Sequence, residues 1–89
     1  MVMPDDMTGA RLALWSLKEG GLTMGPGWAR AHDICQQHEG ERGHDLVHAL
    51  CHWIEGDLSN RDYWYRRAAN WTRADTVEAE WRALDAALI

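Results

Sequence analysis

The middle of the chain carries a row of titratable residues at helical spacing: His44, His48 and His52, followed by Glu55. Residues four apart on an α-helix lie one above the other on the same face, so these side chains would share one strip. Imidazole and carboxylate groups bind zinc and transfer protons near neutral pH. The row therefore predicts a metal site, an acid–base site or a hydrated polar surface.

Metal binding is the first chemistry that this spacing allows, although one ion cannot take all three histidines. His44 and His52 would lie about 12 Å apart along the helix, at roughly 1.5 Å per residue. Two chelating pairs remain, His44 with His48 and His48 with His52, and we expect the metal to be divalent, such as zinc. The alternative is a protein without a cofactor. The candidates for a third ligand are His32, Asp33 and Glu55.

Acid–base catalysis is a second possibility, because an imidazole of His48 or His52 with the carboxylate of Glu55 can form a proton shuttle. Other catalytic signals do not support it. Position 49 is alanine, so the general base of an HExxH motif is missing, and the sequence contains neither CxxC nor GxSxG. Cys51 falls on the apolar side of the helix, where a thiol is expected to belong to the core.

Apolar residues recur with helical spacing throughout the chain, and no alternating strand pattern occurs. This predicts an all-α fold, a small single domain of about five short helices packed as antiparallel hairpins, because the loops are short. The domain would cover residues 1–89, with residues 1–6 flexible. A glycine-bearing turn precedes a Trp- or Ala-rich helix in both halves, which gives a faint tetratricopeptide-like character. One expected stripe is Met7, Ala10, Leu14 and Leu17, and another is Val77, Trp81, Leu84 and Leu88.

The histidine row falls on a helix expected from residue 42 or 43 to Glu55, where Gly56 ends it. A broad apolar side would lie opposite the histidine strip. Its members are Leu46, Val47, Leu50, Cys51, Trp53 and Ile54. Start signals of the other helices are Pro26 for the second, Ser59 with Asp62 for the fourth, and Asp75 with Glu78 for the fifth.

The net charge of −5 and the pI near 5.4 argue against binding to nucleic acid or to an anionic membrane, because both need a basic surface. No segment approaches the roughly 20 apolar residues of a membrane-spanning helix, and the first residues are acidic where a signal peptide is basic. Two cysteines do not make a disulfide framework, so we expect a cytoplasmic protein. The excess of arginine over a single lysine, Lys18, indicates a GC-rich, bacterial gene.

Two segments, WARAHDICQ and HDLVHALCHWIEGDLSNRDYWYRRA, resemble a short, uncharacterised all-helical family of bacterial and fungal genomes. Its motif is roughly A-H-x-I-x-Q, then H-A-x-x-H-R-x-E-G-D-x-x-N-A-x-Y-W-Y-R-R-A, and the match spans about residues 28–68. The resemblance implies no activity. It limits the candidate site residues of the row to His48, His52 and Glu55, and it implies that His44 lies at the surface. The chain departs from the motif at Trp53, where the family has Arg, and at Arg61, where it has Ala. A family site that needs the arginine would be altered, and Arg61 must point outward or open the hairpin slightly.

These patterns together predict a small binding or interaction module with a polar pocket between the second, third and fourth helices. The expected pocket residues are His32, Gln36, His48, His52, Glu55, Asn60, Tyr63 and Arg67. The partner would be an unidentified small ligand or protein, with no nucleic acid and no membrane. One alternative is a metal-assisted or acid–base enzyme that uses His48, His52 and Glu55. The other is a structural homodimer whose tryptophan-rich surface is the interface.

Overall fold

Five helices follow one another in the computed structural model, which describes residues 9–88, and no strand occurs in that range. They are α1 (Gly9–Glu19), α2 (Pro26–Gln36), α3 (Arg42–Glu55), α4 (Leu58–Ala68) and α5 (Val77–Ala87). The all-α prediction and the bounds expected for the histidine-bearing helix are confirmed. The expected flexibility of residues 1–6 and the place of Met7 in the first stripe lie outside the described residues.

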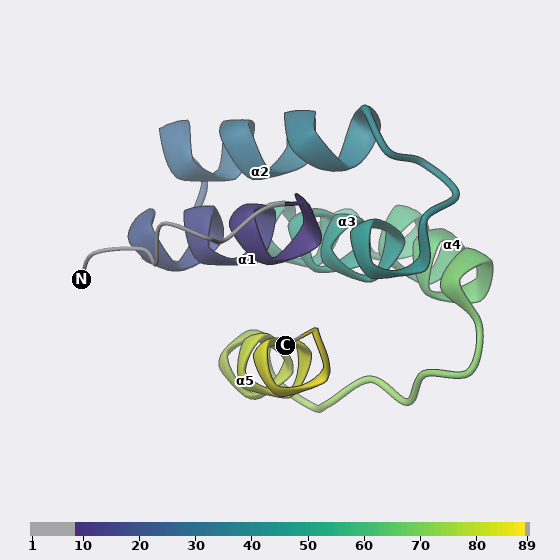
Figure 1. The fold of residues 1–89 in the computed structure, drawn as a ribbon. Coiled ribbons are helices and arrows are strands. Elements are labelled where there is room, and N and C mark those ends of the chain that lie inside the picture. The colour runs from purple at the N-terminus through teal and green to yellow at the C-terminus, as the bar shows by residue number, and fades with distance from the viewer. Residues whose placement is uncertain (1–8, 89) are drawn as a thin grey trace.

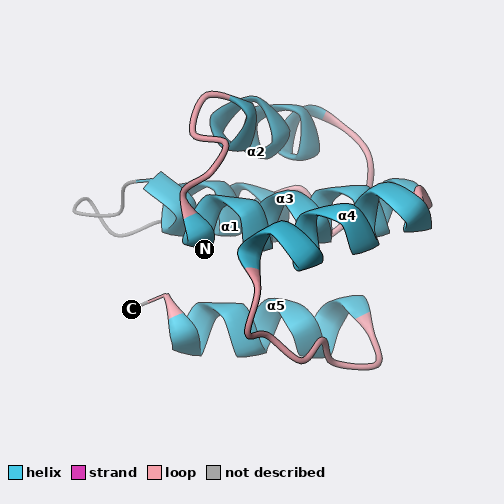
Figure 2. Cartoon of the chain, turned by 90° about the vertical axis from the view of Figure 1, so that its right-hand side faces the viewer, coloured by secondary structure: helices cyan, strands magenta, loops and turns pink. Residues whose placement is uncertain are grey.

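The helices are arranged in three layers (Figures 1 and 2). α2 lies on one side, α5 lies on the opposite side, and α1, α3 and α4 lie between them. α1 and α2 form one antiparallel hairpin and α3 and α4 form another, as short connections favour. No helix within residues 9–88 is long and apolar enough to cross a membrane.

α3 is the central helix, and its residues 44–52 are buried without interruption. It contacts all four other helices, so both its apolar and its polar side are covered. The prediction that His44 lies at the surface is therefore wrong: the exposed fractions of His44, His48 and His52 are 7%, 2% and 8%. The strip is covered because rings from other segments stack on it, Trp64 of α4 on His48 and His38 on His44.

The turn between α3 and α4 brings the last histidine of α3 close to the start of the next helix. Gly56 adopts a left-handed conformation (φ 87°), which glycine tolerates without strain, and it ends α3 as expected. Asp57 caps α4, because its Oδ1 accepts the backbone N–H of Asn60 at 3.3 Å. The predicted cap, Ser59, lies inside α4 and donates its hydroxyl to Asp57 instead.

The other helix starts follow the same rules of N-terminal capping. Pro26 occupies the first turn of α2, as predicted, where its missing N–H costs no hydrogen bond. Thr76 caps α5, because its Oγ1 accepts the backbone N–H of Ala79 at 3.1 Å. The predicted cap Asp75 precedes this position by one residue, so the prediction was displaced by one residue along the chain.

Glu80 is a completely buried carboxylate that joins α5 to the segment leading into it. It accepts hydrogen bonds from the Tyr65 hydroxyl (2.6 Å), the Trp71 indole N–H (2.8 Å) and the Ala74 backbone N–H (3.0 Å). Burial and the bond to Glu80 raise the pKa of the Tyr65 hydroxyl well above its usual range, so it stays a donor. Three donors satisfy the buried carboxylate and hold residues 69–76 against α4 and α5.

α1 and α2 approach each other closely at two glycines. A Cβ placed on Gly27 would lie 2.5 Å from the backbone oxygen of Ser16 and 3.0 Å from the Cα of Gly20. Only glycine fits this contact, which sets the distance between the two helices at the end of α1. The position of α2 over α3, and hence of any side chain on α2, depends on this contact.

Candidate functional site

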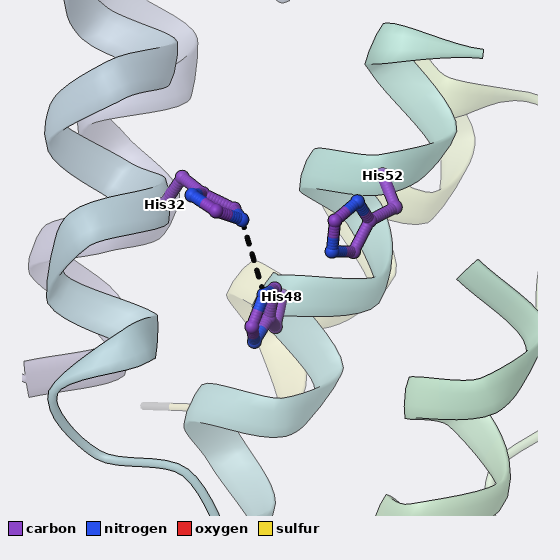
Figure 3. A group of neighbouring side chains, drawn as sticks. All are labelled: His32, His48 and His52. Atoms are coloured by element: carbon purple, nitrogen blue, oxygen red, sulfur yellow. Dashed lines mark hydrogen bonds between the residues drawn. The ribbon is translucent and has the colours of Figure 1, made fainter. Parts of the chain in front are cut away.

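Three imidazoles converge between α2 and α3 (Figure 3). His32 comes from α2, and His48 and His52 come from successive turns of α3. One ring nitrogen from each lies within 4.8 Å of the other two, and a hydrogen bond of 3.2 Å joins Nε2 of His32 and Nε2 of His48. The predicted pair of His48 and His52 is thus brought together, with His32 as the third member. We call these three residues the three-histidine cluster.

Two tryptophans hold the rings of the three-histidine cluster in place. Trp28 stacks on His32 with a centroid distance of 4.7 Å and an interplanar angle of 9°. Trp64 stacks on His48 at 4.1 Å and 19°. His52 stacks on His48 at 4.9 Å, whereas His32 meets both of them edge-on, at 81° and 83°. Packing on aromatic faces fixes the orientation of each ring before any ligand arrives.

Glu55 orients the ring of His52. Its Oε1 lies 2.5 Å from Nδ1 of His52, three residues earlier on α3. Because a carboxylate only accepts hydrogen bonds, Nδ1 carries the proton, and Nε2 of neutral His52 keeps its lone pair. The histidine and glutamate that the sequence placed on one strip therefore act as a pair, with Glu55 as the orienting group.

The interior of the cluster favours neutral imidazoles. Burial, together with the neighbouring His32 and His52, lowers the pKa of His48 from 6.5 to about 3. Burial, with a smaller contribution from His52, also lowers the pKa of His32. Neutral imidazole is the form that binds a metal, because its lone pair is free. Nδ1 of His48 is buried without a hydrogen-bond partner, so this ring is not fully satisfied by the protein.

The two cysteines lie beside the cluster but take no part in it. Cys35 and Cys51 are buried in the core, as predicted from their place on apolar faces. A hydrogen bond with Cys35 and, as a smaller cause, burial raise the pKa of the Cys51 thiol well above its usual range. A protonated thiol is a poor metal ligand and a poor nucleophile, so Cys51 is unsuited to either role.

The remaining residues of the predicted pocket lie outside the three-histidine cluster. Gln36 is exposed at the end of α2, and the amide of Asn60 donates to Asp57 Oδ2 at 2.9 Å. Tyr63 and Arg67 are exposed on α4, where Arg67 donates to the Tyr63 hydroxyl at 3.1 Å. Both of these side chains contact the ring of Trp64, and through it they adjoin His48.

The two departures from the family motif contact each other. The guanidinium carbon of Arg61 lies 5.0 Å from the ring centroid of Trp53, and that of Arg73 lies at the same distance. The Arg61 side chain is only 11% exposed and also donates to Asp62 at 2.9 Å. Arg61 therefore does not point outward, which was the first of the two alternatives expected for it, because the large ring of Trp53 gives it a surface to stack on.

Sequence reasoning missed Trp28 as a member of the site. It precedes His32 by four residues, so helical spacing already placed the two side chains on one face. Its indole N–H also donates to the backbone oxygen of Cys51 at 2.8 Å, which ties α2 to the histidine-bearing part of α3. Asp33, one of the candidates for a third ligand, is exposed and accepts from Gln37 at 2.9 Å.

The chain matches no protein-family model, no curated protein and no solved structure. The resemblance to the family with the H-A-x-x-H motif therefore stays a prediction. Geometry and chemistry of the described residues are the basis for assigning a function.

Proposed function

We propose that this protein binds a divalent transition metal, with zinc the best match, through His32, His48 and His52. The observation that carries the proposal is the convergence of three imidazole nitrogens from two helices within 4.8 Å. Zinc bound tetrahedrally by imidazoles at about 2.0–2.1 Å requires ligand nitrogens about 3.3 Å apart. The separation of 3.2 Å between Nε2 of His32 and Nε2 of His48 is already at that value.

The pair of His52 and Glu55 supplies the outer support that metal ligands usually have. Histidine ligands commonly donate their second ring N–H to a carboxylate, which fixes the tautomer and makes the ligating nitrogen more basic. Glu55 accepts from Nδ1 of His52 and leaves Nε2 for the metal. This hydrogen bond therefore supports metal binding at Nε2 of His52.

The free-energy cost of burying His48 also supports metal binding. Its Nδ1 makes no hydrogen bond, and an unsatisfied buried polar atom costs about 1–3 kcal/mol. An apolar side chain at this central position of α3 would avoid that cost. A histidine at this position in spite of that cost is therefore better explained by a ligand bound at its Nε2 than by packing alone.

Three protein ligands leave at least one coordination position for water or a small molecule. This agrees with the prediction of a small binding module and makes the metal the centre of the binding site. A metal-bound water would also be the reactive group if the protein is an enzyme. Metal binding is common to both alternatives, so it is the property to test first.

The test compares zinc binding by tag-free, chelator-treated protein and two variants on α2, using isothermal titration calorimetry. His32→Ala removes one ligand, and Gln36→Ala removes an exposed polar side chain one turn away as the matched control. We expect His32→Ala to weaken zinc binding at this site by more than about 100-fold, since even loss of an outer partner costs about 10–100-fold. Equal zinc binding by His32→Ala and the wild-type protein would refute the assignment.

A further inference from the structure

We propose a second divalent metal site, formed by His38, Glu41 and His44, at the turn that joins α2 to α3. One ligand atom from each residue lies within 4.8 Å of the others. The two histidines of this site and those of the three-histidine cluster account for every histidine in the chain. This second site shares no residue with the three-histidine cluster and does not depend on metal binding there.

The carboxylate of Glu41 faces Nδ1 of both imidazoles. Its Oε2 is 2.8 Å from Nδ1 of His38, and its Oε1 is 3.7 Å from Nδ1 of His44. The two rings stack at a centroid distance of 4.4 Å, with an interplanar angle of 22°. Both Nδ1 atoms thus face the same carboxylate, and an ion bound there would displace the Nδ1 proton that His38 donates to Glu41. Two imidazoles with one glutamate form a donor set found in catalytic zinc sites.

The backbone of the turn holds these three side chains in register. The His38 N–H donates to the Cys35 oxygen at 3.1 Å, and the Glu41 N–H donates to the His38 oxygen at 3.2 Å. Glu41 is the N-cap residue of α3, with an extended backbone, but its side chain makes no capping hydrogen bond. Its carboxylate is therefore turned to the two imidazoles, although a residue at this position usually uses its side chain to cap the helix.

The exposure of the three side chains suits an ion that arrives from solvent. The His44 side chain is 9% exposed, whereas those of His38 and Glu41 are 44% and 61% exposed. Nε2 of His44 is buried without a hydrogen-bond partner and lies against Gly9 of α1, so Nδ1 is the nitrogen that faces outward. One fixed ligand and two accessible ligands let an ion bind without opening the core.

The two sites are too far apart along α3 to form one dinuclear centre. His44 and His48 are one helical turn apart, which corresponds to about 6 Å along the axis of α3. Two-metal centres hold their ions about 3.5–4 Å apart in a shared site. We therefore infer two separate single-metal sites, one at the surface and one between the helices.

The experiment is a zinc titration of the tag-free, chelator-treated protein, followed by calorimetry and by NMR of the histidine rings. Glu41→Gln removes the bridging carboxylate, and Glu39→Gln is the matched control, an exposed glutamate of the same segment. His38→Ala is a second variant, chosen because the His38 side chain is exposed to solvent. We expect two zinc equivalents for the wild-type protein and for Glu39→Gln. Glu41→Gln and His38→Ala should each lose one equivalent, or bind it more than about 100-fold more weakly.

The outcomes separate the two sites. If the wild-type protein binds one equivalent that His32→Ala abolishes and His38→Ala leaves unchanged, the second site is refuted and the three-histidine cluster stands. If the single equivalent is lost in His38→Ala and retained in His32→Ala, the second site stands and the proposed function fails. Ring signals of His38 and His44 that do not change on addition of zinc would also overturn the second site.

Discussion

Acidification should destabilise the metal-free protein through His48. Burial, with the neighbouring His32 and His52, lowers the pKa of His48 from 6.5 to about 3. Between these two values the unfolded chain binds a proton at this position and the native chain does not, so the free energy of unfolding falls as the pH falls. Above about pH 6.5 neither state binds the proton, and the contribution of His48 is constant.

The expected size of this effect follows from the two pKa values. Lowering the pH from 7 to 5 removes about 2 kcal/mol from the free energy of unfolding through His48 alone. Native domains are stable by about 0.05–0.15 kcal/mol per residue, so this loss is a substantial part of the total for a chain of this length. The pKa of His32 is also lowered, and its contribution has the same sign.

The assay is urea unfolding followed by tryptophan fluorescence at pH 7 and pH 5, with a chelator present to keep the protein metal-free. His48→Leu removes the buried titrating group, and Gln36→Leu replaces an exposed side chain without a titrating group as the control. We expect the pH-dependent loss to shrink by about 2 kcal/mol in His48→Leu and to stay close to the wild-type value in Gln36→Leu. A loss of the same size in His48→Leu and the wild-type protein would refute the reasoning.

Two further substitutions test the contacts that position the site. Glu80→Leu leaves three hydrogen-bond donors without an acceptor and should lower the free energy of unfolding by about 3–5 kcal/mol. Glu80→Gln should cause a smaller loss, and a loss below about 1 kcal/mol in Glu80→Leu would contradict the structure. Gly27→Ala places a methyl group 2.5 Å from the Ser16 oxygen and should cost about 1–3 kcal/mol, measured by thermal unfolding; unchanged stability would show that α1 and α2 are not in such close contact.

Local geometry explains what the sequence could predict about the site. His48 and His52 lie one turn apart on any helix, so their proximity needed only the helical spacing and the Gly56 signal that ends α3. The cysteines were correctly expected in the core, because they fall among apolar residues. These features depend on residues close together in the chain.

Contacts between distant segments explain what the sequence could not predict. His44 follows the same spacing as His48, but it is buried because Gly9 of α1 and the ring of His38 lie against it. A lone glutamate such as Glu80 is ordinarily expected on the exposed side of a helix, and only the folded chain brings three donors to it. The choice of His32 over Asp33 as third member depended in the same way on how α2 rotates over α3.

Asp57 shows a smaller error with a local cause. Ser59 and Asp62 have the spacing of a capping box, and Asp57 two residues earlier is an equally good N-cap residue. The left-handed turn at Gly56 decides between them, because it directs the Asp57 carboxylate to the first N–H groups of α4. Helix ends are set by such competition between neighbouring caps.

X-ray absorption at the zinc edge tests the central claim most directly. The sample is the His38→Ala variant with one equivalent of zinc, so that the ion occupies the three-histidine cluster. Metal binding by His32, His48 and His52 predicts a first shell of three imidazole nitrogens at about 2.0–2.1 Å and one further light atom. A first shell with sulfur at about 2.3 Å would contradict metal binding by these three histidines. So would an unchanged spectrum after His32→Ala is added to the His38→Ala variant.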